Sequence, residues 1–181
     1  METITKTKWV IDKAHSEIGF KIKHLMISNV KGVFNDFDAE IFSSGDDFLS
    51  TDIDLWLDPK SIDTGNTDRD NHLKGADFFD SEQYKEINFT SNTIEKKGDN
   101  FSLYGDLTIK GITKQVKLDV EFGGIMKDPW GNTKAGFTVT GKINRKDWGL
   151  NWNAALETGG FLVSDDVTIN CEIQLLKSQQ A

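Results

Sequence analysis

The polar insertion at 64–80, TGNTDRDNHLKGADFFD, concentrates residue types that could bind a ligand. It holds Arg69 and His72 among several carboxylates, directly before the apolar pair Phe78 and Phe79. Free backbone N–H groups in the first turn of a helix favour anions, and a guanidinium offers several donors in one plane. Arg69 could therefore hold a phosphate or another polar head group. Alternatively, Arg69 pairs with acids such as Asp12 and pins the insertion to the rest of the fold, and the sequence leaves both open.

The three histidines, His15, His24 and His72, are the residues that could form a metal site, since three imidazoles and a water are a known zinc geometry. They form no close-spaced pair such as HxH or HxxxH. We therefore expect each to be a hydrogen-bonded polar residue at a strand end or in a helix. We predict no metal site, and no cofactor apart from a bound polyisoprenoid or other lipid.

The segment DKAHS contains Asp12, His15 and Ser16, the three residue types of a hydrolase triad. Triad side chains must point at one another, whereas adjacent residues in a strand point to opposite faces. The chain also lacks a GxSxG nucleophile elbow. We therefore predict a buried hydrogen-bond network here and assign no catalytic residue.

Two further features carry residues of interest. The segment 143–153, INRKDWGLNWN, groups Arg145 with Trp148 and Trp152, and aromatic side chains beside an arginine could line a ligand entrance. We favour the alternative that this segment is a rim loop capping one end of the fold. Cys171 alternates with polar residues and has no cationic neighbour in sequence, so we predict a small core side chain.

The bulk properties exclude several classes of protein. The 181 residues suit one domain spanning 1–181, and the net charge of -8 with scattered lysines excludes a nucleic-acid binder, which needs a basic face. No run approaches the ~20 apolar residues of a membrane span. The N-terminal stretch lacks the apolar core of a signal peptide. We expect a cytoplasmic protein as the chain is given, and a periplasmic one if a leader has been removed.

Period-two alternation of apolar and polar residues dominates the chain and predicts β-strands. In FSLYGDLTIKG, for example, Phe101, Leu103, Leu107 and Ile109 share one face. The same pattern or strand-like composition recurs in about eight segments, near 18–24, 30–42, 53–57, 87–94, 101–110, 116–122, 134–144 and 167–175.

Short turns join these segments, which predicts an antiparallel meander closed into a barrel. At about eight strands a barrel interior is filled by side chains or holds one small ligand. The insertion interrupts this pattern. Thr67 with Asp70 resembles a helix start and Gly75 a helix end, so we predict a short helical insertion at 67–79 over the barrel mouth or flank.

Five segments in sequence order carry a family resemblance: WVIDKAHSEIGFKIKH, NVKGVFNDF, SIDTGNTDRDNHLKGADFFD, LYGDLTIKGITKQVKL and INRKDWGL. Together they resemble the YceI-like family of lipocalin-like, polyisoprenoid-binding proteins, from about Trp9 to about Ile173. The resemblance implies an extended eight-stranded antiparallel barrel with an internal apolar tunnel for an isoprenoid chain, and often a homodimer. Carried over by motif, the signature polar residues are Asp12, His15, Ser16, His24, Arg69, Asp70 and His72.

We therefore predict a non-catalytic carrier for an isoprenoid, fatty or similar long-chain amphiphile. Arg69, His72 and His15 are expected near its head group or at the helix beside it. The alternatives are a lipid-modifying hydrolase or isomerase using His15 or His72, and a stress-related module with a filled barrel. The predicted ligand contacts are His15, Phe20, Ile22, His24, Phe37, Leu55, Arg69, His72, Phe89, Leu103, Leu107, Phe137 and Trp148. The predicted wall adds Ile18, Leu118, Val120, Val139 and Ile169.

Overall fold

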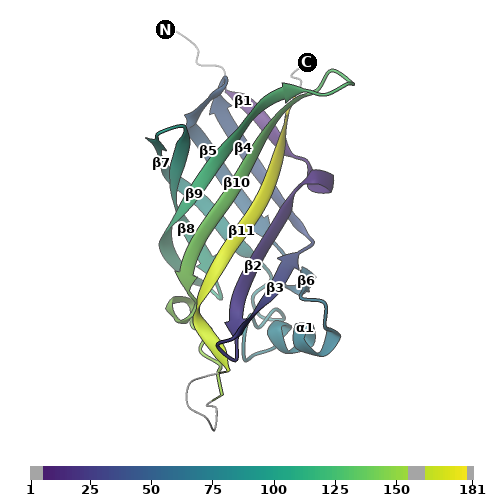
Figure 1. Ribbon diagram of the computed structural model, residues 1–181, viewed down its shortest axis with the longest axis vertical. Coiled ribbons are helices and arrows are strands. Elements are labelled where there is room, and N and C mark those ends of the chain that lie inside the picture. Colours follow the sequence, from purple (N-terminus) through teal and green to yellow (C-terminus); the bar gives the residue numbers. More distant parts are fainter. Residues whose placement is uncertain (1–5, 155–161, 179–181) are drawn as a thin grey trace.

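The computed structural model describes residues 6–154 and 162–178, which form a closed β-barrel (Figure 1). Eight strands make an antiparallel ring in the order β1-β4-β5-β7-β8-β9-β10-β11, and β1 closes it by pairing with β11. This confirms the predicted eight-stranded antiparallel barrel. The ring strands are β1 (Thr7–Ile11), β4 (Phe37–Ser44), β5 (Asp47–Leu57), β7 (Ile87–Lys97), β8 (Asn100–Ile109), β9 (Ile112–Lys127), β10 (Thr133–Asn144) and β11 (Val163–Lys177).

Three more strands extend the sheet at one end of the barrel, below β1 and β4 in Figure 1. They are β2 (Glu17–His24), β3 (Ser28–Phe34) and β6 (Ile62–Asp63), paired in the order β11-β2-β3-β6. The long strand β11 thus pairs with β1 near its C-terminal end and with β2 along its N-terminal part. A 3-10 turn, η1 (Lys13–His15), separates β1 from β2.

The predicted single strand at 30–42 is wrong, because the chain breaks at Asn35 and Asp36 into β3 and β4. The Asn35 N–H donates to the Ser61 carbonyl (3.1 Å), so this backbone leaves the ladder to bond elsewhere. Buried positions shift phase across the break, since Phe34 and Phe37 are both buried although they lie an odd number of residues apart.

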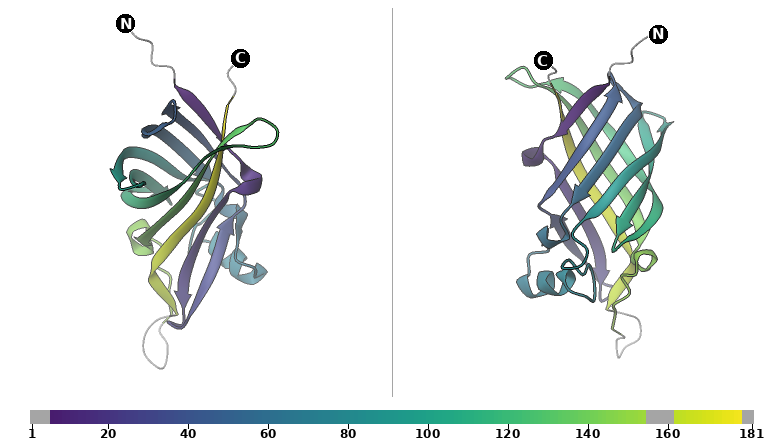
Figure 2. Two further views of the ribbon diagram at one scale, coloured as in Figure 1. Left: turned by 45° about the horizontal axis from the view of Figure 1, so that its top comes forward. Right: turned by 180° about the vertical axis from the view of Figure 1, so that it is seen from behind.

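The helix α1 spans Thr67–Lys74 and lies beside β3 and β6, outside the ring (Figures 1 and 2). It begins at residue 67, as predicted, with Asn66 as the N-cap that accepts from the Arg69 N–H (3.0 Å), but it is shorter than the predicted 67–79. It ends at Gly75, as predicted. The chain then turns back, burying Phe78 and packing Phe79 edge-on against Phe34 with ring centroids 5.8 Å apart. Two 3-10 turns complete the described helices, η2 (Pro59–Ser61) and η3 (Arg145–Trp148).

Aromatic side chains of β1, β5, β9 and β10 pack against one another inside the barrel. Trp9 is fully buried and its Nε1–H donates to the Ser43 hydroxyl (2.8 Å), which satisfies the polar atom of the indole. Phe48 packs on Trp9, Phe122 and Phe137 with centroid separations of 5.1 to 5.5 Å. Within the described part of the chain, no helix is long and apolar enough to cross a membrane.

Candidate functional site

The barrel encloses a cavity of about 610 Å³, within the usual range for small-molecule sites. Every strand of the ring contributes apolar side chains to its wall, and β2 adds more. Twelve residues of the predicted wall line it: Ile18, Phe20, Ile22, Leu55, Phe89, Leu103, Leu107, Leu118, Val120, Phe137, Val139 and Ile169. The alternation of the strands thus places the predicted apolar face toward the cavity.

Some wall side chains lie flat over glycines. The ring of Phe20 covers Gly32 of the partner strand so closely that a Cβ atom added there would lie 2.5 Å from the ring. The ring of Phe89 covers Gly105 of β8 in the same way. The missing glycine side chains let both rings fold against the wall.

One end of the cavity is polar. Its lining includes Lys23 and His24 at the end of β2, the insertion residues Thr64, Asp68, Arg69 and His72, and Arg145 of η3. Three of these side chains are cationic and one is a carboxylate, which gives this end a formal charge of +2 with neutral histidines. Charged residues therefore gather at one end of the cavity, although almost all of the surface that faces the cavity is apolar.

Arg69 binds its own insertion. Its Nε–H donates to the Thr64 hydroxyl and its Nη2–H to the Thr64 carbonyl, both at 2.7 Å, while Asp70 accepts from the Thr64 N–H (2.9 Å). The predicted pairing of Arg69 with Asp12 is wrong, because the carboxylate of Asp12 lies against His15 instead (2.8 Å). The bonds to Thr64 hold the guanidinium in the cavity lining and leave its Nη1 without a protein partner among the described residues.

His72 lines the same end and is fixed by its neighbours. Its Nε2 lies 2.9 Å from the Asp77 carboxylate. Its ring packs edge-on against Trp152 and Phe78, with centroids 4.8 and 5.1 Å apart. The described residues contain no group of three or more His, Cys, Asp or Glu side chains placed to hold a metal ion.

Arg145 is the site residue that the sequence analysis did not assign to the ligand. It is 2% exposed, and its guanidinium donates to the carbonyls of Leu150 (2.5 Å), Trp152 (2.8 Å) and Ser164 (2.9 Å). Burial lowers its pKa, an effect that the nearby Asp165 opposes. The guanidinium therefore ties the segment after η3 to the start of β11 and brings a buried cation to the cavity wall.

His15 lies away from the cavity, which corrects its predicted place beside Arg69 and His72. It sits in η1, outside the strand pattern, with its side chain 58% exposed. Its partner Asp12 also binds Lys134 (3.0 Å). Burial alone would raise the pKa of Asp12, but the hydrogen bonds from His15 and Lys134 outweigh it and lower that pKa. The predicted hydrogen-bond network exists, but it is not buried as predicted, because the side chain of His15 is exposed.

Phe37 and Trp148 also lie outside the cavity lining. Phe37 is buried at the start of β4 within the packed core. Trp148 is 2% exposed, and its Nε1–H donates to the Leu107 carbonyl (2.9 Å). Trp148 thus seals the barrel wall, as the rim-loop interpretation expects, while Trp152 of the same segment lines the cavity.

Cys171 faces the cavity from β11 and is buried. Burial raises the pKa of its thiol to about 11. It is therefore a small apolar wall residue, as predicted, and a poor nucleophile near neutral pH.

Comparisons with known proteins agree with this architecture. Residues 9–175 match the YceI-like domain family. A UPF0312 protein of Staphylococcus aureus is 41% identical over 174 residues, covering 96% of this chain and 99% of the relative. The Campylobacter jejuni YCEI protein superposes with a TM-score of 0.72 at 35% identity, covering 99% of this chain and 100% of that one. A polyisoprenoid binding domain from Saccharophagus degradans shares the fold, with a TM-score of 0.66 at 14% identity over 94% of this chain and 98% of that one.

Proposed function

The chain belongs to the YceI-like domain family, and we propose that it is a non-catalytic carrier that encloses the chain of an isoprenoid or similar amphiphile. A binding role agrees with the family and with the fold shared with a polyisoprenoid binding domain. The ligand class is inferred from the cavity itself.

The observation that carries the proposal is the polarity of the cavity. Its interior is lined by apolar side chains from every strand of the ring, and burial of apolar surface contributes about 25 cal/mol per Å². Its charged lining residues come from the end of β2, from α1 and from η3. A long molecule with an apolar tail and one polar head matches this distribution.

The head-group end favours an anionic or strongly polar head. Its lining includes Arg69 and Arg145 against the single carboxylate of Asp68, whereas Lys23 is exposed to solvent. The guanidinium of Arg145 donates its hydrogen bonds to backbone carbonyls, whereas Nη1 of Arg69 has no protein partner among the described residues. We therefore assign Arg69 to the ligand head and Arg145 to the support of the site.

The two alternatives from the sequence receive less support. An enzyme using His15 would need that side chain at the cavity, and it lies elsewhere. His72 is at the cavity, but its hydrogen bond goes to Asp77, and none joins it to a hydroxyl or thiol of a described residue. A filled barrel is at odds with a cavity of about 610 Å³.

Native mass spectrometry of the protein purified from its own host, followed by denaturing extraction, tests the proposal. We expect a bound amphiphile with an isoprenoid or other long apolar chain. An empty protein that also refuses prenyl and fatty probes after delipidation would refute the carrier function. Turnover of the extracted lipid that His72→Ala abolishes, with binding retained, would assign an enzyme instead.

The assignment of Arg69 is tested separately with delipidated protein. Arg69→Gln should weaken binding of a prenyl phosphate about tenfold or more, since hydrogen bonds to charged groups are worth roughly 1.5–3 kcal/mol, and should affect the matching prenyl alcohol less. Lys74→Gln, at the end of the same helix but outside the cavity lining, is the control and should leave both affinities unchanged. Equal losses for phosphate and alcohol would make Arg69 a brace for the insertion only.

The oligomer and the compartment stay predictions. The homodimer that the family resemblance implies can be checked by sedimentation at equilibrium. Fractionation of the host cell distinguishes the expected cytoplasmic location from a periplasmic one.

A further inference from the structure

The turn between β2 and β3 exposes three consecutive apolar side chains. Leu25, Met26 and Ile27 are 38%, 64% and 84% exposed. The turn that carries them lies at the lower end of the barrel in Figure 1, at the tip of the hairpin that β2 and β3 form. We call these three residues the hairpin tip. Scattered single apolar residues are normal on a surface, but a run of three at one protruding turn needs an explanation.

The backbone of the hairpin tip makes this choice of residues unfavourable for folding alone. Leu25 and Met26 both have positive φ, at 54° and 63°, and the Ile27 N–H donates to the His24 carbonyl (3.2 Å). Positive φ at both central positions is the requirement of a type I′ turn, for which Asn-Gly is the preferred sequence. Two bulky apolar residues there cost stability, so a role outside the fold accounts for them better.

The hairpin that carries the tip is basic although the protein is acidic. Lys21, Lys23 and Lys31 stand against the single carboxylate of Glu17 in the hairpin at 17–34, whereas the whole chain has a net charge of -8. Asp165 and Asp166 of the adjacent strand β11 are each already paired with a lysine, at 3.3 and 3.6 Å. The hairpin tip is therefore apolar and is flanked by the positively charged lysines of β2 and β3.

The hairpin tip also adjoins the polar end of the cavity. Lys23 and His24, the last residues of β2, line the cavity. The Leu25 N–H donates to the carbonyl of Leu162, which is another lining residue (2.9 Å). Whatever the tip touches therefore lies next to the end through which a ligand head would face outward.

We propose that the hairpin tip docks the protein on an anionic lipid bilayer, with Leu25, Met26 and Ile27 in the boundary between head groups and acyl chains and the lysines against lipid phosphates. Apolar residues flanked by basic ones are the pattern of interfacial membrane binding, and each basic residue near an anionic surface adds to the attraction. This goes beyond ligand storage, because it gives the cavity a contact with the membrane in which long-chain amphiphiles reside.

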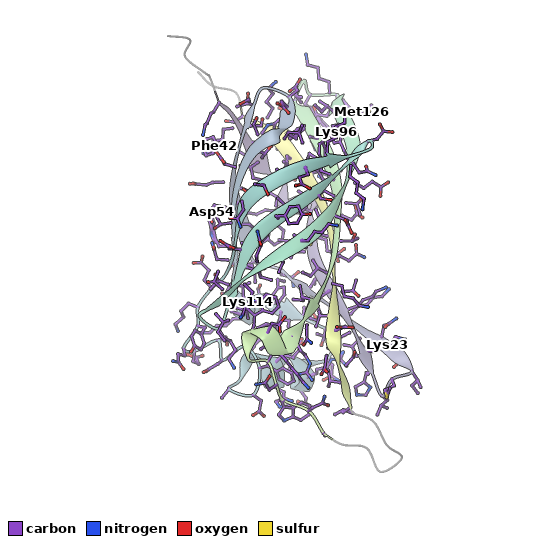
Figure 3. The ribbon with its side chains drawn as sticks, turned by 90° about the vertical axis from the view of Figure 1, so that its left-hand side faces the viewer. Lys23, Phe42, Asp54, Lys96, Lys114 and Met126 are labelled. Carbon is purple, nitrogen blue, oxygen red and sulfur yellow. The ribbon has the colours of Figure 1, made fainter. Side chains whose placement is uncertain are left out.

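The opposite end of the barrel offers an internal comparison. The β9–β10 turn there exposes Met126 and Trp130, at 76% and 82%. Figure 3 places Met126 and Lys23 at opposite ends of the barrel. The stretch 121–134 carries two lysines and two acids, so it lacks the positive charge of the β2–β3 hairpin. The two turns therefore differ in charge, although the insertion beside β3 adds Asp68, Asp70, Asp77 and Asp80 to the end that carries the hairpin tip.

Co-sedimentation with vesicles of equal parts phosphatidylglycerol and phosphatidylcholine tests the proposal, with pure phosphatidylcholine vesicles as the comparison. Ile27→Asp should reduce binding to the anionic vesicles about tenfold or more, because an isoleucine side chain gains on the order of 1.5–3 kcal/mol on burial. Met126→Asp, at a similarly exposed position (76% against 84% for Ile27) at the other end, is the matched control and should bind as wild type. Binding should also weaken as ionic strength rises from about 0.1 M to about 1 M.

A second variant separates docking from folding. Leu25→Asn combined with Met26→Gly installs the preferred type I′ sequence, so it should raise the unfolding temperature while it lowers vesicle binding. A wild-type protein that ignores both kinds of vesicle would overturn the proposal. So would binding that Met126→Asp abolishes and Ile27→Asp preserves. A dimer that Ile27→Asp dissociates, without vesicle binding, would assign the tip to a second copy of the chain. Uptake of a short soluble prenyl probe by all variants would show that ligand binding is a separate property.

Discussion

The size of the cavity sets a limit on the length of chain that it can enclose, and this limit can be measured. A cavity of about 150 Å³ accepts benzene with its six carbons, so a cavity of about 610 Å³ has room for roughly 24 carbons. That corresponds to about five isoprene units. A longer chain would leave its remaining units, or its head, outside the protein.

The limit can be tested by varying the length of the bound chain. Prenyl alcohols that grow by one isoprene unit at a time should bind more tightly with each unit until the cavity is full. The binding free energy per non-hydrogen ligand atom falls to about 0.3 kcal/mol for larger ligands, whereas full transfer of a methylene group out of water contributes about 0.8 kcal/mol. Each five-carbon unit should thus contribute about 1.5 kcal/mol or more, which is at least a tenfold gain in affinity.

Delipidated protein and thermal unfolding provide the assay, because a ligand that binds only the folded state stabilises it by RT ln(1 + [L]/Kd). Affinities from this shift, checked by isothermal titration calorimetry, should rise steeply with length and level off near five isoprene units. Affinity that does not change with length, or that keeps rising well beyond this point, would refute the reasoning from cavity volume.

A variant that shortens the cavity supplies the control. Val120 lines the cavity from β9, and Val120→Trp would occupy the room of about seven ligand atoms. The plateau should then move down by about one isoprene unit. Val10→Trp, which adds the same bulk at a 41% exposed residue of β1, should leave the plateau unchanged.

Three further predictions concern stability and reactivity. Arg145→Lys should lower the free energy of unfolding by about 3 kcal/mol or more in urea titrations, because one ammonium group cannot replace the guanidinium bonds to several carbonyls and each such bond is worth roughly 1.5–3 kcal/mol. The Cys171 thiol, with a pKa of about 11, should react with iodoacetamide at pH 8 on the order of a hundredfold more slowly than in the urea-unfolded chain, and faster as pH rises toward that value. Asp12→Asn should destabilise the protein at neutral pH, and the difference from wild type should disappear as pH falls below about 4. The pKa of Asp12 is lower in the folded chain than in the unfolded chain, so its negative charge stabilises the fold above the unfolded pKa, and this stabilisation is lost as pH falls through the folded pKa.

Each of these predictions has a clear contrary result. A loss below about 1 kcal/mol in Arg145→Lys would mean that the buried guanidinium is dispensable for the rim segment. Native Cys171 that reacts as fast as the unfolded chain would show an open and solvated wall. A stability difference for Asp12→Asn that persists at acid pH would point to packing of the side chain, and away from its charge.

The barrel and most of its wall could be predicted because period-two alternation reports directly which side chains face inward. Leu103 and Leu107, for example, alternate with polar residues and line the cavity as expected. Alternation does not tell whether the space in front of an inward residue is filled. Phe37 has the right phase within its strand and is nevertheless part of the packed core.

The errors at the polar residues have a different cause. His15 was assigned from its residue type and motif, but the η1 turn interrupts the strand and directs it away from the cavity. Arg145 was expected on a rim loop, where a charged side chain is normally solvated, and its backbone acceptors come from segments that the local pattern does not bring together. The phase slip between Phe34 and Phe37 was a readable signal of the β3–β4 break. Long-range hydrogen bonds leave no comparable trace in one sequence.

The glycines beneath Phe20 and Phe89 determine how wide the barrel is at those points. A methyl group at Gly32 would press on the Phe20 ring and on the Thr64 methyl group, whereas one at Gly105 would also clash with the backbone carbonyl of Thr90 (2.7 Å). Neither glycine lines the cavity, so ligand preference can change through residues that the ligand does not contact. Exchange between glycine and alanine at position 32, where only side-chain atoms are in the way, is thus a route by which selectivity for thinner or bulkier chains can change while every side chain of the lining stays the same.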